Sequence, residues 1–249
     1  MTDLQGTPDI CKHILEHCPE HLRAEIEEGL GRGETDRAAE EAHYKNEQRI
    51  AQISSRRRQQ QADCGLSGKQ WGNMFTTFRG QTVSQRHALT HAEKFVDRWP
   101  EVKCGAAYWG APGIGKDHLL HGIVQAVLDK EAIYKVRYWY ALDFERALFS
   151  DWHDGHSQED TRTEEQARGC DLLLIGDIHH LVAPTTTAWV KRVAVGIINQ
   201  CETTGKPILC CTSNYPLSEF DERNLAVGSR LAACCNWKQV AGEDHRRTL

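Results

Sequence analysis

The sequence predicts an α/β protein whose mostly parallel sheet is flanked by helices, and two observations indicate this class. Short apolar segments with the character of strands alternate with helical patterns between residues 105 and 212. A glycine-rich loop joins the first of these strands to the helix that follows it. Alternation of this kind forms βαβ units, in which successive strands run parallel.

The expected elements follow one another in a regular order. A chain of 249 residues has room for one α/β domain of ordinary size and a smaller appendage. The strands are expected at Gly105–Trp109, Lys135–Tyr140, Asp171–Ile175 and Pro207–Thr212, and the helices at 84–99, 116–130, 142–150 and 187–203.

The N-terminal part, residues 1–62, is more polar in its residue pattern than residues 63–249, which form the expected main domain. Two short helical patterns in residues 9–30 carry apolar stripes that are too narrow to make a core alone and need a partner surface. A polar helix is expected over residues 34–62, ending in the basic run Arg56–Arg58. It is either a solvated linker helix or a contact to nucleic acid or an acidic partner.

Composition and charge narrow the class of protein. The net charge of −5 and the pI near 6.2 argue against a surface built wholly for nucleic acid, although they leave room for a local basic track. No apolar run approaches the roughly 18–20 residues that span a bilayer, and no secretory signal is evident, so we expect a cytoplasmic protein without a membrane partner. The ten cysteines are interpreted as small hydrophobic residues in a reducing compartment.

The strongest motif is a phosphate-binding loop between the first strand and its helix. Its glycines let successive backbone N–H groups face a phosphate, the helix directs its N-terminus at the same anion, and Lys116 reaches the β and γ phosphates. We therefore expect ATP as the cofactor. The predicted nucleotide-binding residues are Gly110, Ala111, Pro112, Gly113, Ile114, Gly115, Lys116, Asp117 and His118.

Asp117 departs from the usual pattern of this loop. The residue after the lysine is normally Ser or Thr, whose hydroxyl group binds Mg²⁺. A carboxylate can also bind Mg²⁺, and when ionised it adds negative charge beside the triphosphate. Nucleotide binding is then expected to depend on the metal more strictly than usual.

The apolar strand at 171–175 continues into Gly176 and Asp177, where such ATPases usually carry two acids. Asp177 is the predicted catalytic carboxylate. It either polarises the attacking water or binds Mg²⁺ together with Asp117, so both are candidate metal ligands. With one carboxylate at this strand end, we expect slow hydrolysis or ATP binding without turnover. Asn214, after the last predicted strand, is expected to contact the γ-phosphate or the water.

From Cys64 to its end, the sequence resembles the DnaC/DnaI bacterial helicase loaders, which are AAA+ proteins of the initiator clade. The resemblance includes CGLSGKQWGNMFTTFRG, GAPGIGKDHLL, DLLLIGDI, TSN, GSRL and GEDHRR, in this order. It implies an AAA+ P-loop NTPase domain, with a replicative DNA helicase and single-stranded DNA as partners.

The resemblance also implies roles for particular residues. Arg230 becomes the arginine finger that acts on a neighbour's ATP, so that the protein self-associates through its ATP sites, and Arg246 becomes a second sensor. The N-terminal region binds the helicase. The segment Tyr140–His153 helps to track single-stranded DNA or is an ordinary surface helix with Leu142, Ala147 and Leu148 facing inward. Some loaders of this family hold zinc near the N-terminus. The resemblance therefore raises the question of whether zinc is bound here by Cys11, His13, His17, Cys18 and His21.

Three functions remain open at this stage. The first is an ATP-dependent loader of the replicative helicase onto single-stranded DNA, with a weak or regulated ATPase. The second is an IstB-like transposition helper that binds duplex DNA and a transposase. The third is a nucleotide-binding adaptor without turnover, favoured by the altered acidic positions at Asp117 and Gly176.

Overall fold

The protein is described by a computed structural model that places residues 43–49, 51–52, 55, 58–130, 134–153 and 161–245. The chain divides into two units, residues 1–55 and 56–249. The described residues of the first unit are helical and exposed. The predicted boundary at residues 62 and 63 stays a prediction, and the candidate zinc ligands lie outside the described residues, as do Arg56, Arg57 and Arg246.

The second unit is built around a five-stranded parallel sheet with the strand order β2-β3-β4-β1-β5. This arrangement confirms the predicted α/β class. The strands are β1 (Gly105–Trp109), β2 (Val136–Tyr140), β3 (Leu172–Gly176), β4 (Ile208–Ser213) and β5 (Cys235–Gln239). Strand β4 lies between β1 and β3, so the ends of three strands that carry the predicted motifs are neighbours.

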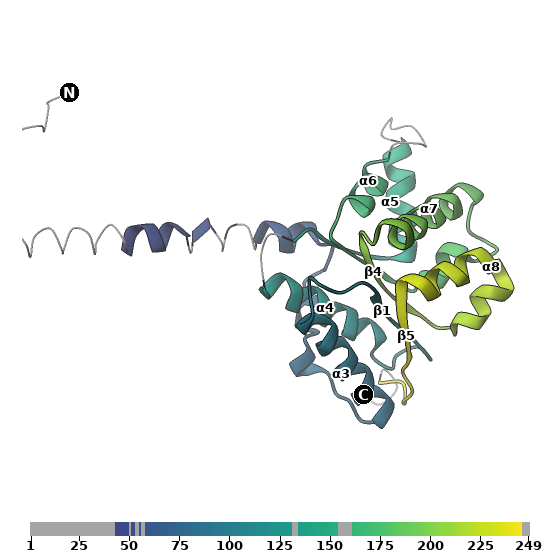
Figure 1. The fold of residues 1–249 in the computed structure, drawn as a ribbon, viewed down its shortest axis with the longest axis horizontal. Coiled ribbons are helices and arrows are strands. Elements are labelled where there is room, and N and C mark those ends of the chain that lie inside the picture. Colours follow the sequence, from purple (N-terminus) through teal and green to yellow (C-terminus); the bar gives the residue numbers. More distant parts are fainter. Residues whose placement is uncertain are drawn as a thin grey trace, which may run out of the picture. The chain divides into compact units, whose positions relative to one another are not determined.

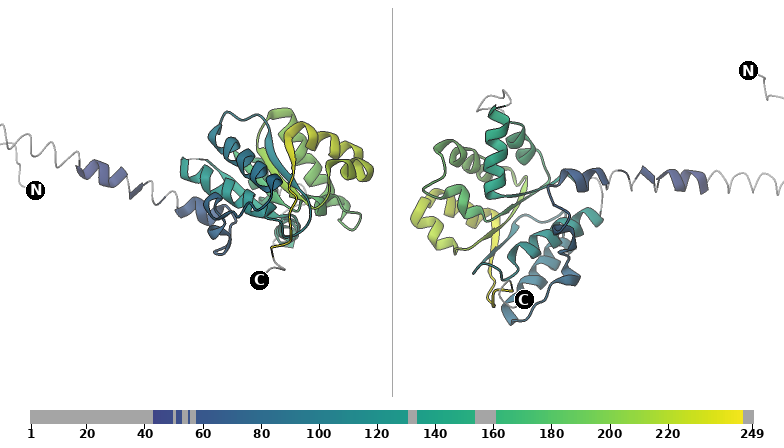
Figure 2. Two further views of the ribbon diagram at one scale, coloured as in Figure 1. Left: turned by 90° about the horizontal axis from the view of Figure 1, so that it is seen from below. Right: turned by 180° about the vertical axis from the view of Figure 1, so that it is seen from behind.

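Helices cover both faces of this sheet (Figure 1). One face packs against α3 (Val83–Asp97) and α4 (Lys116–Lys130) around Tyr108 and Leu174. The other face packs against α5 (Ala141–His153), α6 (Arg162–Arg168), α7 (Ala188–Thr204) and α8 (Leu217–Cys234). The two further views in Figure 2 show the same three layers.

Local sequence explains where these helices begin and end. Thr82 caps α3 by accepting a hydrogen bond from the backbone N–H of Gln85, whose side chain accepts from the N–H of Thr82 in return. Thr187 caps α7 in the same way through Val190, and Gly205 ends that helix with a φ of 67°. Short 3-10 helices, η1 (Gln70–Gly72), η2 (Phe75–Thr77) and η3 (Ile178–Val182), complete the unit.

The sequence-based expectations for α5 need a correction. Leu142 is 47% exposed and Ala147 is half-buried, whereas Ala141, Phe144 and Leu148 face the core. Helix α5 begins directly after β2, so the buried position of Ala141 sets which face of the helix packs inward. Elements α6, α8 and β5 were not expected from the pattern of apolar residues.

The described cysteines are free thiols, and seven of these eight are buried. Cys210 and Cys211 lie within β4, and Cys234 and Cys235 mark the junction between α8 and β5. Burial raises the pKa of Cys210 to about 12, so its thiol stays neutral. In the described part of the chain, no helix has both the length and the apolar character needed to cross a membrane.

Candidate functional site

The predicted phosphate loop connects β1 to the N-terminus of α4, where the backbone takes conformations that favour glycine. Gly113 and Gly115 have φ angles of 78° and 96°. A Cβ atom on Gly115 would lie 2.8 Å from the ring of Phe78, and one on Gly113 would collide with the carboxylate of Asp244. Both glycines are therefore required by the backbone and by close neighbours.

The amino group of Lys116 is held at the base of this loop. It donates hydrogen bonds to the carbonyl oxygens of Gly110 at 2.9 Å and Ala111 at 2.8 Å, and to Oδ1 of Asn214 at 3.0 Å. Lys116 is only 5% exposed. The contact with Asn214 joins the phosphate loop to the end of β4 and brings these two predicted site residues together.

Thr212 links the two candidate metal ligands. Its hydroxyl group donates a hydrogen bond of 2.7 Å to Oδ1 of Asp117 and accepts one of 2.9 Å from the backbone N–H of Asp177. Asp177 has a φ of 54°, which turns the chain sharply after β3. The sequence did not point to Thr212, because a threonine near the end of an apolar strand is an ordinary strand residue.

Two tyrosines of β2 lie against the same corner of the site. A Cβ atom on Gly176 would lie 2.7 Å from Cδ1 of Tyr140 and 3.0 Å from the hydroxyl oxygen of Tyr138. Burial, with a smaller effect of the Asp117 carboxylate, raises the pKa of both tyrosines. The tyrosines therefore stay neutral and fill the space that a side chain at position 176 would need.

This corner fits a magnesium ion held together with a nucleotide. Mg²⁺ is usually bound through one or two carboxylates together with substrate phosphates and water. Asp117 and Asp177 supply carboxylate oxygens of the right chemistry. Within the described ranges, no group of three or more His, Cys, Asp or Glu side chains could hold a metal without such a ligand.

A cavity of about 550 Å³ opens beside the phosphate loop, a size typical of small-molecule sites. Its walls include Gly113, Gly115 and Lys116 on one side and the segment 73–81 on the other. That segment was part of the sequence resemblance but had no assigned role. The remaining wall residues are Asp117, His118, His121, Tyr140 and His245.

Hydrogen bonds fix segment 73–81 to α4. Nδ2 of Asn73 lies 2.9 Å from Nδ1 of His121, and Nε2 of His118 lies 2.8 Å from the carbonyl oxygen of Met74. Burial lowers the pKa of His118, and it lowers that of His121 to about 4. Both rings are thus neutral near pH 7. The ring of Phe78 packs edge-on against His118 at 5.3 Å.

The other predicted residues lie in different places. Ile114 is buried in the core below the loop, and Pro112 is exposed. Arg230 lies on α8, where its Nε atom is 3.6 Å from a carboxylate oxygen of Glu202, and it does not line the cavity. An arginine that acts on a neighbour's nucleotide is expected outside its own site.

The fold and the site together define a P-loop NTPase domain of the AAA+ type, with a phosphate loop, an acidic strand end and a polar strand end in neighbouring positions. A sequence model described as the bacterial DnaA ATPase domain matches residues 72–235, and the chain belongs to this family.

Known relatives show how far this similarity extends. The chromosomal replication initiator protein DnaA of Thermotoga petrophila is 31% identical over 150 residues, which are 59% of this chain and 33% of the relative. The matched segment thus spans only about a third of that relative. A DnaC helicase loader superposes with a TM-score of 0.60 at 20% identity, over 70% of this chain and 100% of that chain. AMPPCP-bound DnaA from Aquifex aeolicus superposes with a TM-score of 0.58 at 19% identity, over 74% of this chain and 53% of that chain.

These likenesses confirm the fold that the loader resemblance implied.

Proposed function

We propose that this protein is an ATP-controlled loader that places a replicative DNA helicase on single-stranded DNA when replication begins. Its family, which is named for an initiator ATPase domain, supports a role in this process. The observation that carries the choice of a loader is the extent of the structural match. The DnaC loader is covered over its whole length, whereas the DnaA structure is covered over about half.

The nucleotide in this proposal is ATP with Mg²⁺, bound in the cavity beside the phosphate loop. Lys116 reaches the β and γ phosphates from its position between Gly110 and Asn214. Asp117 and Asp177, which both contact Thr212, the latter through its backbone N–H, would hold Mg²⁺. The metal would neutralise phosphate charge, and the AMPPCP-bound DnaA neighbour supports this choice of nucleotide.

Turnover would depend on Asp177 and Asn214. Because Tyr138 and Tyr140 leave no room for a carboxylate at position 176, Asp117 supplies the missing acid from the phosphate-loop side. Asp177 then either completes the metal ligands or polarises the attacking water, and Asn214 positions that water or the γ-phosphate. A single acid at the strand end favours slow hydrolysis.

Arg230 would complete the ATP site of a neighbouring copy. Its position on α8, outside its own nucleotide cavity, fits an arginine that acts in trans. ATP then holds adjacent copies together, and hydrolysis or loss of the arginine contact releases the helicase. Residues 1–62, most of which lie outside the described residues, would bind the helicase.

A second candidate is a nucleotide-binding adaptor without turnover, and the loss of the acid at Gly176 specifically favours it. In that case ATP alone would support assembly. The transposition helper is a further alternative, and it differs by requiring duplex DNA.

The experiment that tests the proposal measures helicase loading on circular single-stranded DNA, which offers no free end for threading. The replicative helicase of the same cell, ATP and an annealed oligonucleotide are combined with the wild-type protein or with Lys116→Ala. A loader makes oligonucleotide release depend on the wild-type protein and lose that dependence in the variant. Release at the same rate with and without the protein would rule out a loader. Release that is equally fast with an Asp177→Ala variant, in which only this protein's own turnover is impaired, would favour the adaptor.

A further inference from the structure

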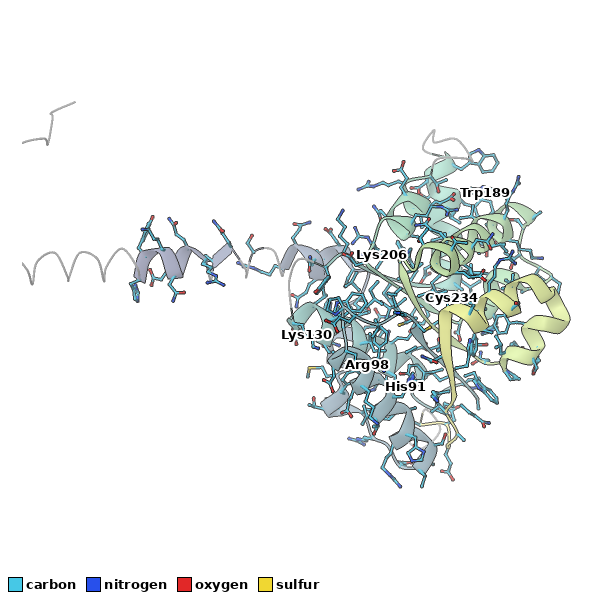
Figure 3. All side chains as sticks on the ribbon, viewed as in Figure 1. His91, Arg98, Lys130, Trp189, Lys206 and Cys234 are labelled. Carbon is cyan, nitrogen blue, oxygen red and sulfur yellow. The ribbon has the colours of Figure 1, made fainter. Side chains whose placement is uncertain are left out.

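A hollow separate from the nucleotide cavity lies along α3, beside the edge strand β5. It consists of two adjoining depressions of about 440 and 620 Å³, which share His91, Lys94 and Lys238 in their walls. Neither has a wall residue in common with the nucleotide cavity. Figure 3 labels two wall residues of this hollow, His91 on α3 and Arg98 directly after that helix. We call this feature the α3–β5 groove.

The groove concentrates positive charge on a protein whose net charge is −5. Its charged wall residues are the cations Lys94, Arg98, Lys103 and Lys238 and one acid, Glu101. All four cations are exposed, and none forms an ion pair with another described residue. An uncompensated basic cluster of this kind attracts a polyanion.

The polar side chains of the helix wall are arranged in a line. His87, His91, Lys94 and Arg98 are spaced by four, three and four residues, so they form one stripe along α3 and its C-cap, in which Lys94 and Arg98 are the cations. Neighbouring members of such a stripe lie about 5–6 Å apart, and the stripe is roughly 16 Å long. The acids of this helix, Glu93 and Asp97, line neither depression.

The other wall is rigid. Strand β5 pairs with β1 along its whole length, and Lys238 lies on it beside neutral polar residues, Asn236 and Gln239. Ser84 of α3 donates a hydrogen bond of 3.0 Å to the carbonyl oxygen of Gln239, which ties the helix to the strand end. His91 is held in turn by the hydroxyl group of Tyr108 at 3.1 Å.

We propose that the α3–β5 groove binds the phosphate backbone of a nucleic acid strand, as a contact surface additional to the ATP site. A row of donors at regular intervals matches a polymer that carries one negative charge per nucleotide. The side-chain amides of Asn236 and Gln239, beside Lys238, can donate hydrogen bonds to phosphate oxygens. The inference relies on the proposed function only in the choice of nucleic acid over an acidic protein.

Charge reversal tests this proposal directly. The affinity of fluorescently labelled single-stranded and duplex oligonucleotides is measured by anisotropy at several salt concentrations for the wild type and for Lys94→Glu combined with Lys238→Glu. The matched control combines Lys69→Glu with Arg192→Glu, two exposed residues outside the groove that give the same change in net charge. ATP binding by each protein shows that the nucleotide cavity is intact.

The groove variant is expected to bind at least about tenfold more weakly at low salt, while the control binds as the wild type does. Its slope of log affinity against log salt concentration should fall by about 1.4 for a single strand, or about 0.7 for each lost phosphate contact. Unchanged affinity and slope would overturn the proposal, as would a wild-type protein that binds neither oligonucleotide. If the wild-type protein binds polyglutamate but neither oligonucleotide, the groove would be assigned to an acidic protein partner instead.

A footprint on the wild-type protein supplies a second readout. Cys104 lines the groove and is partly exposed, whereas the other described cysteines are buried. A bound oligonucleotide should slow alkylation of Cys104 severalfold, as followed by mass spectrometry of its peptide. Equal alkylation with and without saturating oligonucleotide would contradict the proposal. Protection of Cys104 by duplex but not by single-stranded oligonucleotide would support nucleic acid binding in the groove and argue against loading on single strands.

Discussion

Thr212 donates its hydroxyl hydrogen to Asp117 across 2.7 Å, joining the first turn of α4 to the end of β4. The carboxylate is therefore fixed at the position where phosphate-loop proteins normally carry a hydroxyl group. This places a negative charge next to the expected triphosphate. We therefore expect the affinity for ATP to depend strongly on bound Mg²⁺.

The variant Asp117→Asn tests that coupling. Wild-type protein should bind ATP at least about tenfold more tightly with Mg²⁺ than with a chelator, because the carboxylate repels bare triphosphate and binds the metal. The asparagine variant should bind more tightly than the wild type in the chelator and show a much smaller effect of Mg²⁺. Asp129→Asn, at the exposed far end of the same helix, is the control and should keep the wild-type ratio. A similar Mg²⁺ effect in wild type and Asp117→Asn would exclude Asp117 as a metal ligand.

Packing at Gly176 leads to a prediction about stability. The Gly176→Ala variant forces Cβ against Tyr140 and Tyr138, so its free energy of unfolding should be lower by about 1–3 kcal/mol. Denaturation by urea measures this change. Gly68→Ala, where an added Cβ meets nothing within 4 Å, should change the value by less than about 0.5 kcal/mol. If both variants unfold at the same urea concentration, the tyrosines do not restrict position 176.

His121 makes stability depend on pH. Its folded pKa of about 4 is below the ordinary value of 6.5, so the unfolded chain binds its proton first as the pH falls. Stability from this group is present above pH 6.5 and is lost progressively between pH 6.5 and about 4. Between pH 7 and pH 5 the loss should amount to about 2 kcal/mol.

His121→Gln removes the titrating ring and should flatten the stability profile by this amount in urea denaturation at the two pH values. His87→Gln, on the exposed surface, is the control and should retain the wild-type profile. An undiminished loss of stability at pH 5 in His121→Gln would assign the effect to other groups.

Arg230 and Lys116 are predicted to work in different copies of the protein at one ATP site. Arg230→Ala should bind ATP but hydrolyse it at least about tenfold more slowly, and Lys116→Ala should not bind it. A mixture of the two variants should regain part of the turnover, because the Lys116→Ala copy supplies an intact Arg230 to its neighbour. Turnover by the mixture that equals the sum of the separate variants would argue against action in trans. Arg192→Ala, at an exposed position of α7, is the control and should behave as the wild type.

Much of the fold could be predicted from short-range pattern. Strand β1 and helix α4 have the bounds expected from the sequence, because an apolar strand, a glycine loop and a helical pattern are each visible locally. The junction of α8 and β5 was missed, since Cys234 and Cys235 change from helix to strand without a glycine, proline or other turn residue. The prediction of which face of α5 packs inward was wrong, because it placed Leu142 in the core on account of its apolar side chain, whereas that side chain is exposed.

The site could be predicted where one motif contained the residues. Lys116 belongs to the phosphate-loop motif and Asn214 to the polar end of β4, and each was recognisable in its own segment; the structure brings the two together. The roles of Thr212, Tyr138 and Tyr140 depend on three strands lying side by side, which leaves no local signal. The wall formed by segment 73–81 depends likewise on its packing against His118 and His121.

The most direct test of the central claim is equilibrium binding of a fluorescent ATP analogue with Mg²⁺ to wild-type protein and Lys116→Ala. Lys116 donates to Gly110, Ala111 and Asn214 at the base of the loop, so its removal should weaken binding by about a hundredfold or more while the fold persists by circular dichroism. Nucleotide affinity that is the same in a folded Lys116→Ala variant would contradict the phosphate-loop site and the ATP-controlled function built on it.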